Sequence, residues 1–309
     1  MIRTLAFAAQ NGRYILLLGL IAGLLLQDVA QFLKPWLPSM VAFLLFLTAF
    51  RIGHRKALGE LADVADTLKV VLVYQLVLPL LAIVVFKAFG LSGSMYSIAA
   101  ILLFAAAPLA GGPNLAIMLG GRPEPALRVL ILGTALLPLT VIPVFWLAPE
   151  LGGFGTILTA SFKLLGTIWL AILAAFLLRA FAFPDFSQAK TEALDGVMAT
   201  TLAAMAVGLM AALGPAIVRD PWTVTKWMGF AFIGNLGLQF AAFKVMQFVG
   251  RANVAVPIAV VAGNRNIALF LVALPVAKSE TFLIFLGCYQ FPVLLTAILM
   301  RPIFQLRRD

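Results

Sequence analysis

Charged residues are scarce in this sequence of 309 residues, because Asp, Glu, Lys and Arg together make up only 11% of it. Average soluble domains carry about 25% charged and roughly 45–50% apolar residues. This shortage excludes an ordinary water-soluble enzyme, a disordered chain and a soluble nucleic-acid-binding protein. We therefore expect no nucleic acid as a partner, although the formal net charge is +10.

Cysteine and histidine are almost absent. The single Cys288 excludes a disulfide framework within the chain and any multi-cysteine metal site. The single His54 excludes a histidine metal cluster, so we expect no cofactor. The segment 90–93 has the rhomboid-type pattern Gly-x-Ser-Gly, but no histidine lies at membrane depth to act as a base. No aspartate pair lies in mid-membrane either, and we expect no enzyme.

Apolar residues are abundant, at 63% of the chain with a mean hydropathy of +1.08. A helix rises about 1.5 Å per residue and the hydrocarbon core is about 30 Å thick, so a spanning helix needs roughly 20 apolar residues. The pattern predicts an all-α polytopic protein that is embedded in the lipid bilayer. The ten predicted spans are 14–33, 36–50, 68–89, 96–119, 126–147, 157–179, 194–214, 222–249, 253–276 and 281–300.

The basic residues indicate the orientation of the spans. With both termini in the cytoplasm, more than twice as many Lys and Arg residues lie inside as outside. This distribution is typical of membrane proteins, in which basic loops stay in the cytoplasm. We therefore expect a multi-pass protein of the bacterial cytoplasmic (inner) membrane, either as a monomer or as a homo-oligomer.

The chain divides into two halves, 1–148 and 149–309, with five predicted spans each. An odd number of spans per half inverts the second half relative to the first. The fourth span of each half is interrupted, and such matched breaks are the best sequence indication of a transporter's binding site. Unwinding frees backbone groups that only protein, water or a ligand can satisfy. The candidate crossover and substrate-binding residues are Gly111, Gly112, Pro113, Asn114, Gly263, Asn264, Arg265 and Asn266.

Arg265 is the most informative of these residues, because an arginine at the centre of a span costs about 2.5–3.5 kcal/mol. No acidic residue lies in the middle of a predicted span to pair with it. Its guanidinium either binds a substrate anion bidentately or rests on unwound carbonyls in place of a cation. Gln75, Asn235 and Gln239 are candidate polar lining residues, with interhelical hydrogen bonding as the alternative.

The sequence around the breaks resembles the bile acid:sodium symporter family, in a superfamily that includes arsenite and auxin carriers. The segment 108–114 has the Pro-to-Asn spacing of the family's Pro-Gly-Gly…Ser-Asn signature. The segment 74–79 is similar to its Gln-Phe…Met-Pro stretch, and 261–266 takes the place of Glu-x-Gly-x-Gln-Asn. The resemblance implies a panel domain (spans 1, 2, 6 and 7) and a core domain (spans 3–5 and 8–10). In the core, discontinuous spans 4 and 9 cross at mid-membrane.

The chain is a divergent member by this resemblance, because its sodium-site motifs are altered. Sodium is a hard cation bound by oxygen ligands. The changes argue against conventional two-sodium coupling and leave at most a vestigial sodium site near Asn114. In place of the family's span-4 serine, span-9 glutamate and glutamine, and span-5 hydroxyls, this chain carries Pro113, Val261, Arg265, Leu127 and Ile131.

These observations predict a secondary transporter that moves a small or amphipathic organic anion by alternating access. The alternatives are an anion exchanger or facilitator and an efflux permease of the arsenite- or auxin-carrier type. A channel is the remote alternative, because matched inverted breaks favour a carrier.

Overall fold

The computed structural model describes residues 2–54, 64–151, 153–183, 187–275 and 279–305. Helices make up nearly all of this part of the chain, and its one β-type pairing is an isolated bridge. The longer elements are α1 (Ile2–Gln10), α2 (Gly12–Leu25), α3 (Gln27–Leu33), α4 (Leu37–Ile52), α6 (Val64–Leu72), α7 (Leu78–Ala88), α8 (Met95–Ala105), α9 (Gly112–Met118), α10 (Pro123–Leu147), α11 (Phe154–Phe181), α12 (Gln188–Arg219), α13 (Pro221–Phe232), α14 (Leu238–Phe248), α15 (Ala255–Gly263), α16 (Glu280–Leu299) and α17 (Arg301–Gln305).

Short 3₁₀ or π-helical segments connect several of these helices. Two π-helical turns, η3 (Val73–Val77) and η5 (Ile233–Gly237), join α6 to α7 and α13 to α14 without ending the helix. The 3₁₀ segment η7 (Ile267–Val272) follows α15. The remaining 3₁₀ turns are η1 (Lys34–Trp36), η4 (Pro149–Leu151) and η6 (Ala252–Val254).

Seven helices in the described part of the chain are long and apolar enough to cross a membrane. The prediction of an all-helical, multi-pass membrane protein is confirmed at this level. Three further apolar helices are shorter, and they overlap the predicted spans 14–33, 96–119 and 253–276, so the number ten stays a prediction. The seven long helices are Gln27–Ile52, Val64–Ala88, Pro123–Leu147, Gly155–Phe181, Gln188–Arg219, Pro221–Phe248 and Glu280–Leu299.

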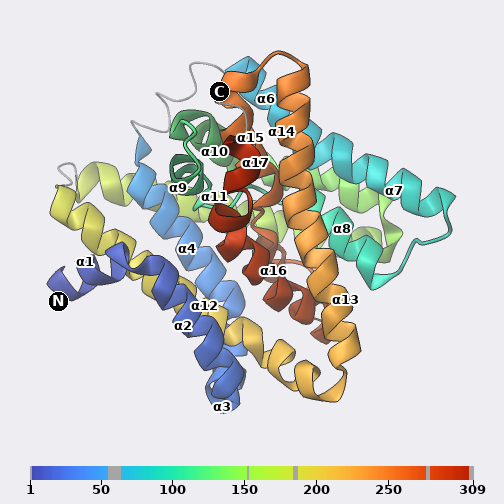
Figure 1. The fold of residues 1–309 in the computed structure, drawn as a ribbon, viewed down its shortest axis with the longest axis horizontal. Coiled ribbons are helices and arrows are strands. Elements are labelled where there is room, and N and C mark those ends of the chain that lie inside the picture. The colour runs from blue at the N-terminus through green and yellow to red at the C-terminus, as the bar shows by residue number, and fades with distance from the viewer. Residues whose placement is uncertain (1, 55–63, 152, 184–186, 276–278, 306–309) are drawn as a thin grey trace.

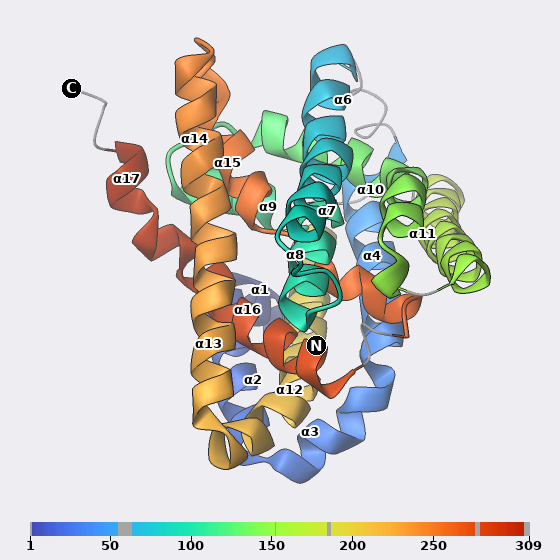
Figure 2. The ribbon, with the colours of Figure 1, turned by 90° about the vertical axis from the view of Figure 1, so that its right-hand side faces the viewer.

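Helices from the two halves of the chain pack against each other. α12 lies along α1 and α2 and contacts α4, which also packs on α11 (Figure 1). α10 packs on α6, α9 and α15, while α16 packs on α13. Figure 2 shows α13 and α14 as one long helix, with α9 and α15 side by side near it. Contacts of α4 and α11 with η7, and of α12 with α16, join these two sets of helices.

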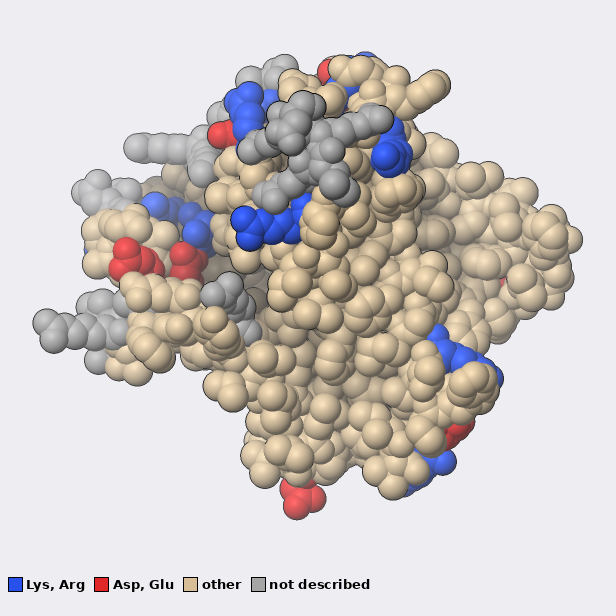
Figure 3. Space-filling view, in the orientation of Figure 1, with Lys and Arg blue, Asp and Glu red and all other residues tan. Residues whose placement is uncertain are grey.

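Charged side chains lie toward opposite ends of the visible face, with a broad band free of charge between them (Figure 3). Arg51 and Asp195 form a two-pronged ion pair between the end of α4 and the start of α12, with Nη2 to Oδ2 at 2.9 Å. Asp66 pairs with Lys69 at 3.0 Å and with Arg251 at 2.9 Å. The band suits the hydrocarbon region, where unpaired charge is costly.

Two glycines bring α2 close to α12. A Cβ atom at Gly19 would lie 2.7 Å from the carbonyl oxygen of Ala203, and one at Gly23 would lie 2.8 Å from that of Val207. Small residues spaced four apart let membrane helices pack with their backbones nearly in contact. This close approach holds α12 against α2, and α12 also forms part of the wall of a cavity.

We expect Gly23→Ala to lower the free energy of unfolding by about 1–3 kcal/mol, because the added methyl group meets backbone atoms that cannot move aside. Gly166→Ala on α11 is the matched control, since its Cβ would meet nothing within 4 Å. The control gains only helix propensity. Denaturation of the purified protein in detergent measures both, and equal stability of the two variants contradicts the proposed close packing.

Candidate functional site

The two interrupted spans meet as a short antiparallel pairing. Pro108, between α8 and α9, forms a β-bridge with Arg265, between α15 and η7. The Leu109 N–H donates to the Asn264 carbonyl at 2.8 Å, and the Asn266 N–H donates to the Ala107 carbonyl at 2.8 Å. Each break thus satisfies backbone groups of the other. We call residues 106–111 and 264–266 together the crossing.

The helix that precedes each break has its C-terminal end next to the crossing. α8 ends at Ala105 and α15 at Gly263. The C-terminal end of a helix carries a partial negative charge and leaves carbonyls without intrahelical partners. The Phe104 carbonyl is one of these, because Pro108, four residues on, has no N–H to donate. Two partly negative helix ends therefore converge in the membrane interior.

Arg265 follows the end of α15 and reaches the end of α8 with its guanidinium, and only 2% of its surface is exposed. Its Nη2 donates to the Phe104 carbonyl at 3.1 Å, and its guanidinium carbon lies 5.0 Å from the centre of the Tyr74 ring. Its backbone N–H donates to the Tyr289 hydroxyl at 3.1 Å. Nε and Nη1 have no hydrogen-bond partner among the described residues. Arg265 is also the one buried ionisable side chain in the described part that carries a charge at neutral pH.

A buried amide network holds α15 against α13–α14 and α16. Asn235 Nδ2 donates to the Gly263 carbonyl at 2.9 Å, and Gln239 Nε2 donates to Asn235 Oδ1 at 2.7 Å. The Thr296 hydroxyl accepts from Gln239 at 3.1 Å and lies 3.2 Å from Asn264 Oδ1. Asn235 and Gln239 are fully buried, so the structure places these two predicted polar residues between helices.

Gln75 occupies a similar place on the other side of the crossing. Its Nε2 donates to the Gly133 carbonyl at 3.0 Å, and its Oε1 accepts from the Thr140 hydroxyl at 3.2 Å, both on α10. Gln75 is the third residue of the π-helical turn η3, just as Asn235 is the third residue of η5. Such π-helical turns are rare and frequent at functional sites.

A cavity of about 250 Å³ lies beside the crossing. Its walls come from α4, α11 and α12 on one side and from α10 and the crossing on the other. Pro108, Leu109 and Ala110 contribute backbone and apolar surface, and the polar side chains in its wall are Thr48, Thr134 and Asn266. Arg265 is not part of this wall, although it is bridged to Pro108 and precedes Asn266.

The other predicted site residues take different positions. Gly112 is buried, and a Cβ added to it would lie 3.1 Å from a methyl group of Val261, while Gly111 and Pro113 are half-buried at the start of α9. Asn114 is exposed on α9 and does not line the cavity. Gly263 is buried, and an added Cβ would strike the Asn235 carbonyl oxygen.

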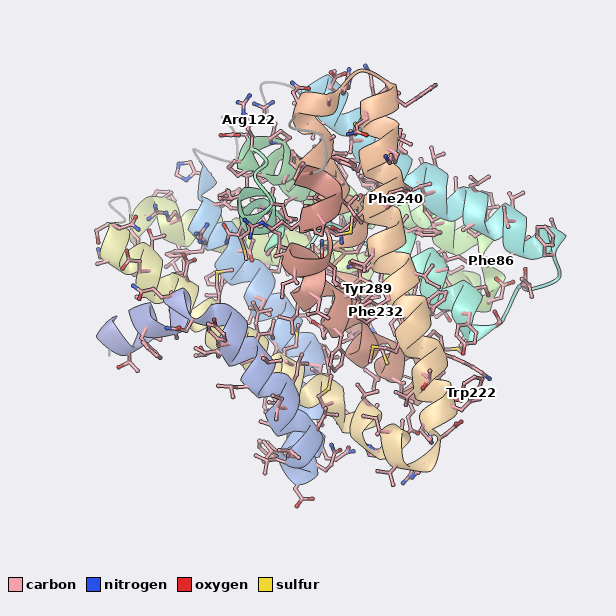
Figure 4. The ribbon with its side chains drawn as sticks, viewed as in Figure 1. Phe86, Arg122, Trp222, Phe232, Phe240 and Tyr289 are labelled. Carbon is pink, nitrogen blue, oxygen red and sulfur yellow. The ribbon has the colours of Figure 1, made fainter. Side chains whose placement is uncertain are left out.

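Sequence reasoning missed several hydroxyl groups at the site. Leu127 and Ile131 are apolar as noted, but Thr134, further along the same helix, is buried and lines the cavity. Tyr289 and Thr296 lie two helical turns apart and thus on one face of α16. Polar residues at this spacing in an otherwise apolar span were the available signal. Figure 4 places Tyr289 midway between Arg122 and Trp222, which lie near opposite ends of the molecule.

Comparison with known proteins assigns no family to this chain. Neither a scan against protein-family models nor a search of curated proteins finds a match for its sequence. The resemblance to bile acid:sodium symporters therefore stays a prediction from the residues, and function has to be argued from the geometry above.

We expect Tyr289→Phe to destabilise the protein by about 1–3 kcal/mol, because the buried Arg265 N–H loses its acceptor. The Tyr289 hydroxyl also donates to the Gly263 carbonyl, which keeps its bond from Asn235. Tyr96→Phe is the matched control, because the partly exposed Tyr96 ring stacks on Trp227 and the variant keeps this ring contact. If thermal denaturation in detergent finds both variants equally stable, the hydroxyl does not hold the crossing together.

Proposed function

We propose that this protein is a secondary transporter that moves an organic anion across the membrane by alternating access. The observation that supports this most directly is the crossing of two interrupted helices beside a cavity. Irregular backbone at membrane depth is found where it is buried in protein or lines a cavity, and in transporters it forms the binding site. A channel would need a continuous polar pathway, whereas the wall of this cavity is largely apolar.

The order of elements around the crossing supports two inverted repeats of the same design. In the first, a helix with a π-helical turn (α6–η3–α7) precedes the interrupted pair α8 and α9, and α10 follows. In the second, α13–η5–α14 precedes the interrupted α15 and η7, and α16 follows. In each, a threonine of the last helix bonds to a polar residue of the first, Thr140 to Gln75 and Thr296 to Gln239.

The position of the cavity favours a mechanism in which two groups of helices move relative to each other. α4, α11 and α12 form the wall that faces the crossing, and they include parts of the panel domain that the resemblance implies. α10 and the crossing belong to the core. Sliding of one group against the other would expose a cavity at their boundary first to one side of the membrane and then to the other.

The chemistry of the cavity favours an anion with an apolar body. Apolar side chains dominate the wall, and its volume lies just below the roughly 300–1,000 Å³ range of ligand pockets. The charge of Arg265 has no acidic counter-charge among the buried residues that the structure describes. Because the low-dielectric interior screens charge weakly, this charge favours an anion in the adjoining cavity.

The substrate class can be tested with pairs of compounds that differ only in charge. We expect small aromatic and alicyclic carboxylates to raise the melting temperature of the purified protein, and their primary amides, which have the same shape, to raise it less. Carboxylates that bind should exchange across proteoliposome membranes. Stabilisation by the amides alone, or movement of cations in place of anions, overturns the proposed substrate class.

The cavity itself can be tested by filling it. Ala135 is on α10 in its wall, and we expect Ala135→Phe to reduce uptake of a bound carboxylate by about tenfold, because the ring occupies the space of the substrate. Ala174→Phe on the exposed face of α11 is the matched control. Uptake that falls equally in both variants, or in neither, argues against transport through this cavity.

A further inference from the structure

We infer that Arg265 is a tethered cation that permanently occupies a cation site at the crossing, so that transport needs no coupling ion. This inference rests on the proposed function, because it names the energetics of the same site. Arg265 is a positioning residue that acts through the crossing. Three features of its surroundings support this role.

The first feature is that the groups around the guanidinium are electron-rich. The Phe104 carbonyl accepts from Nη2, and the centre of the Tyr74 ring lies 5.0 Å from the guanidinium carbon. The C-terminal ends of α8 and α15 both adjoin the crossing to which Arg265 belongs. Half-helix C-terminal ends and unwound carbonyls are the groups with which transporters hold sodium or protons. The face of an aromatic ring adds the same preference for a cation.

The second feature is that the helix ends at the crossing favour a positive charge. Two partly negative helix ends repel each other in a medium of low dielectric constant, and a nearby cation weakens this repulsion. The Phe104 carbonyl has no N–H available at position 108, since that residue is proline. In the described part of the chain, no other cationic side chain is buried, so Arg265 supplies this charge.

The third feature is that Arg265 cannot leave. Its backbone is paired with Pro108 and its N–H is bonded to the Tyr289 hydroxyl at 3.1 Å. A coupling ion must bind on one side of the membrane and dissociate on the other, and a covalently attached guanidinium does neither. The consequence is exchange or facilitated movement that follows the gradient of the substrate anion.

The same geometry explains how one residue serves two purposes. Only Nη2 of the guanidinium is bonded to a described protein group, and Nε and Nη1 have no partner there. The positive charge is therefore only partly compensated within the protein. It stabilises the crossing and leaves a positive potential for the substrate anion in the adjoining cavity.

The wild-type protein gives the first test, without any need for transport. We expect its melting temperature in detergent to be the same in sodium, potassium and choline chloride at equal ionic strength. A saturable rise of several degrees in sodium alone overturns the inference, because it would reveal a functional ion site beside Arg265.

Variants of Arg265 give the second test. Arg265→Gln should lower the melting temperature by about 5 °C or more in choline chloride. Sodium or potassium should restore part of this loss saturably, since the Phe104 carbonyl and the Tyr74 ring are then free to hold an ion. Arg265→Lys should keep the cation-independent behaviour of the wild type. The inference is overturned if the Arg265→Gln variant is as stable as the wild type in every salt. It is also overturned if no cation restores the melting temperature of Arg265→Gln and Arg265→Lys is destabilised as much.

Lys163→Gln is the matched control, because it removes an exposed basic charge within α11, far along the chain from the crossing. It should change neither the melting temperature nor its salt dependence. A salt response equal to that of Arg265→Gln would show a general effect of charge and overturn the inference.

Anion exchange by wild-type proteoliposomes separates this inference from the proposed function. Exchange at equal rates in sodium-free potassium and in sodium buffers supports both. Exchange that requires sodium overturns the tethered cation but leaves the transporter. If no carboxylate is exchanged while the salt pattern of the variants holds, the transporter proposal fails and the cation site stands.

Discussion

Backbone N–H and C=O groups in a membrane interior must find partners, and the structure around the crossing depends on this constraint. Pro108 interrupts its span and leaves the Phe104 carbonyl without an intrahelical donor. The second interrupted span supplies this donor through Arg265 Nη2, and it pairs with the first span through the bridge to residue 265 and the bonds of Leu109 and Asn266. Either break alone would be costly in hydrocarbon, whereas together they satisfy each other.

Polar residues around the crossing are buried between helices and support it from both sides. The π-helical turns η3 and η5 present Gln75 and Asn235 to the helices that flank the crossing. Gln75 binds α10, and Asn235 binds the last carbonyl of α15. These amides hold the interrupted segments in one geometry, and the apolar cavity forms beside them. The site thus combines a hydrogen-bonded polar support with a largely apolar cavity wall.

The close packing of α2 on α12 and the polar support of the crossing are separate devices. At Gly19 and Gly23, the absence of a side chain lets the backbones of α2 and α12 approach closely. At the crossing, by contrast, hydrogen bonds and one positive charge hold the segments together. α12 connects the two regions, because it packs on α2 and contributes to the cavity wall.

The sequence by itself determined the helical class, the membrane setting and the two interruptions, because apolar length, Pro108 and the Gly263–Asn266 stretch act locally on the chain. It also singled out Arg265, since an arginine in the middle of a predicted span with no acidic residue to pair with is rare and marks a candidate site. Only the tertiary structure decided that Arg265 binds the Phe104 carbonyl, outside the cavity wall, and that Asn114 is exposed. Burial, hydrogen-bond partners and cavities depend on which helices come to lie side by side, and local sequence does not contain that information.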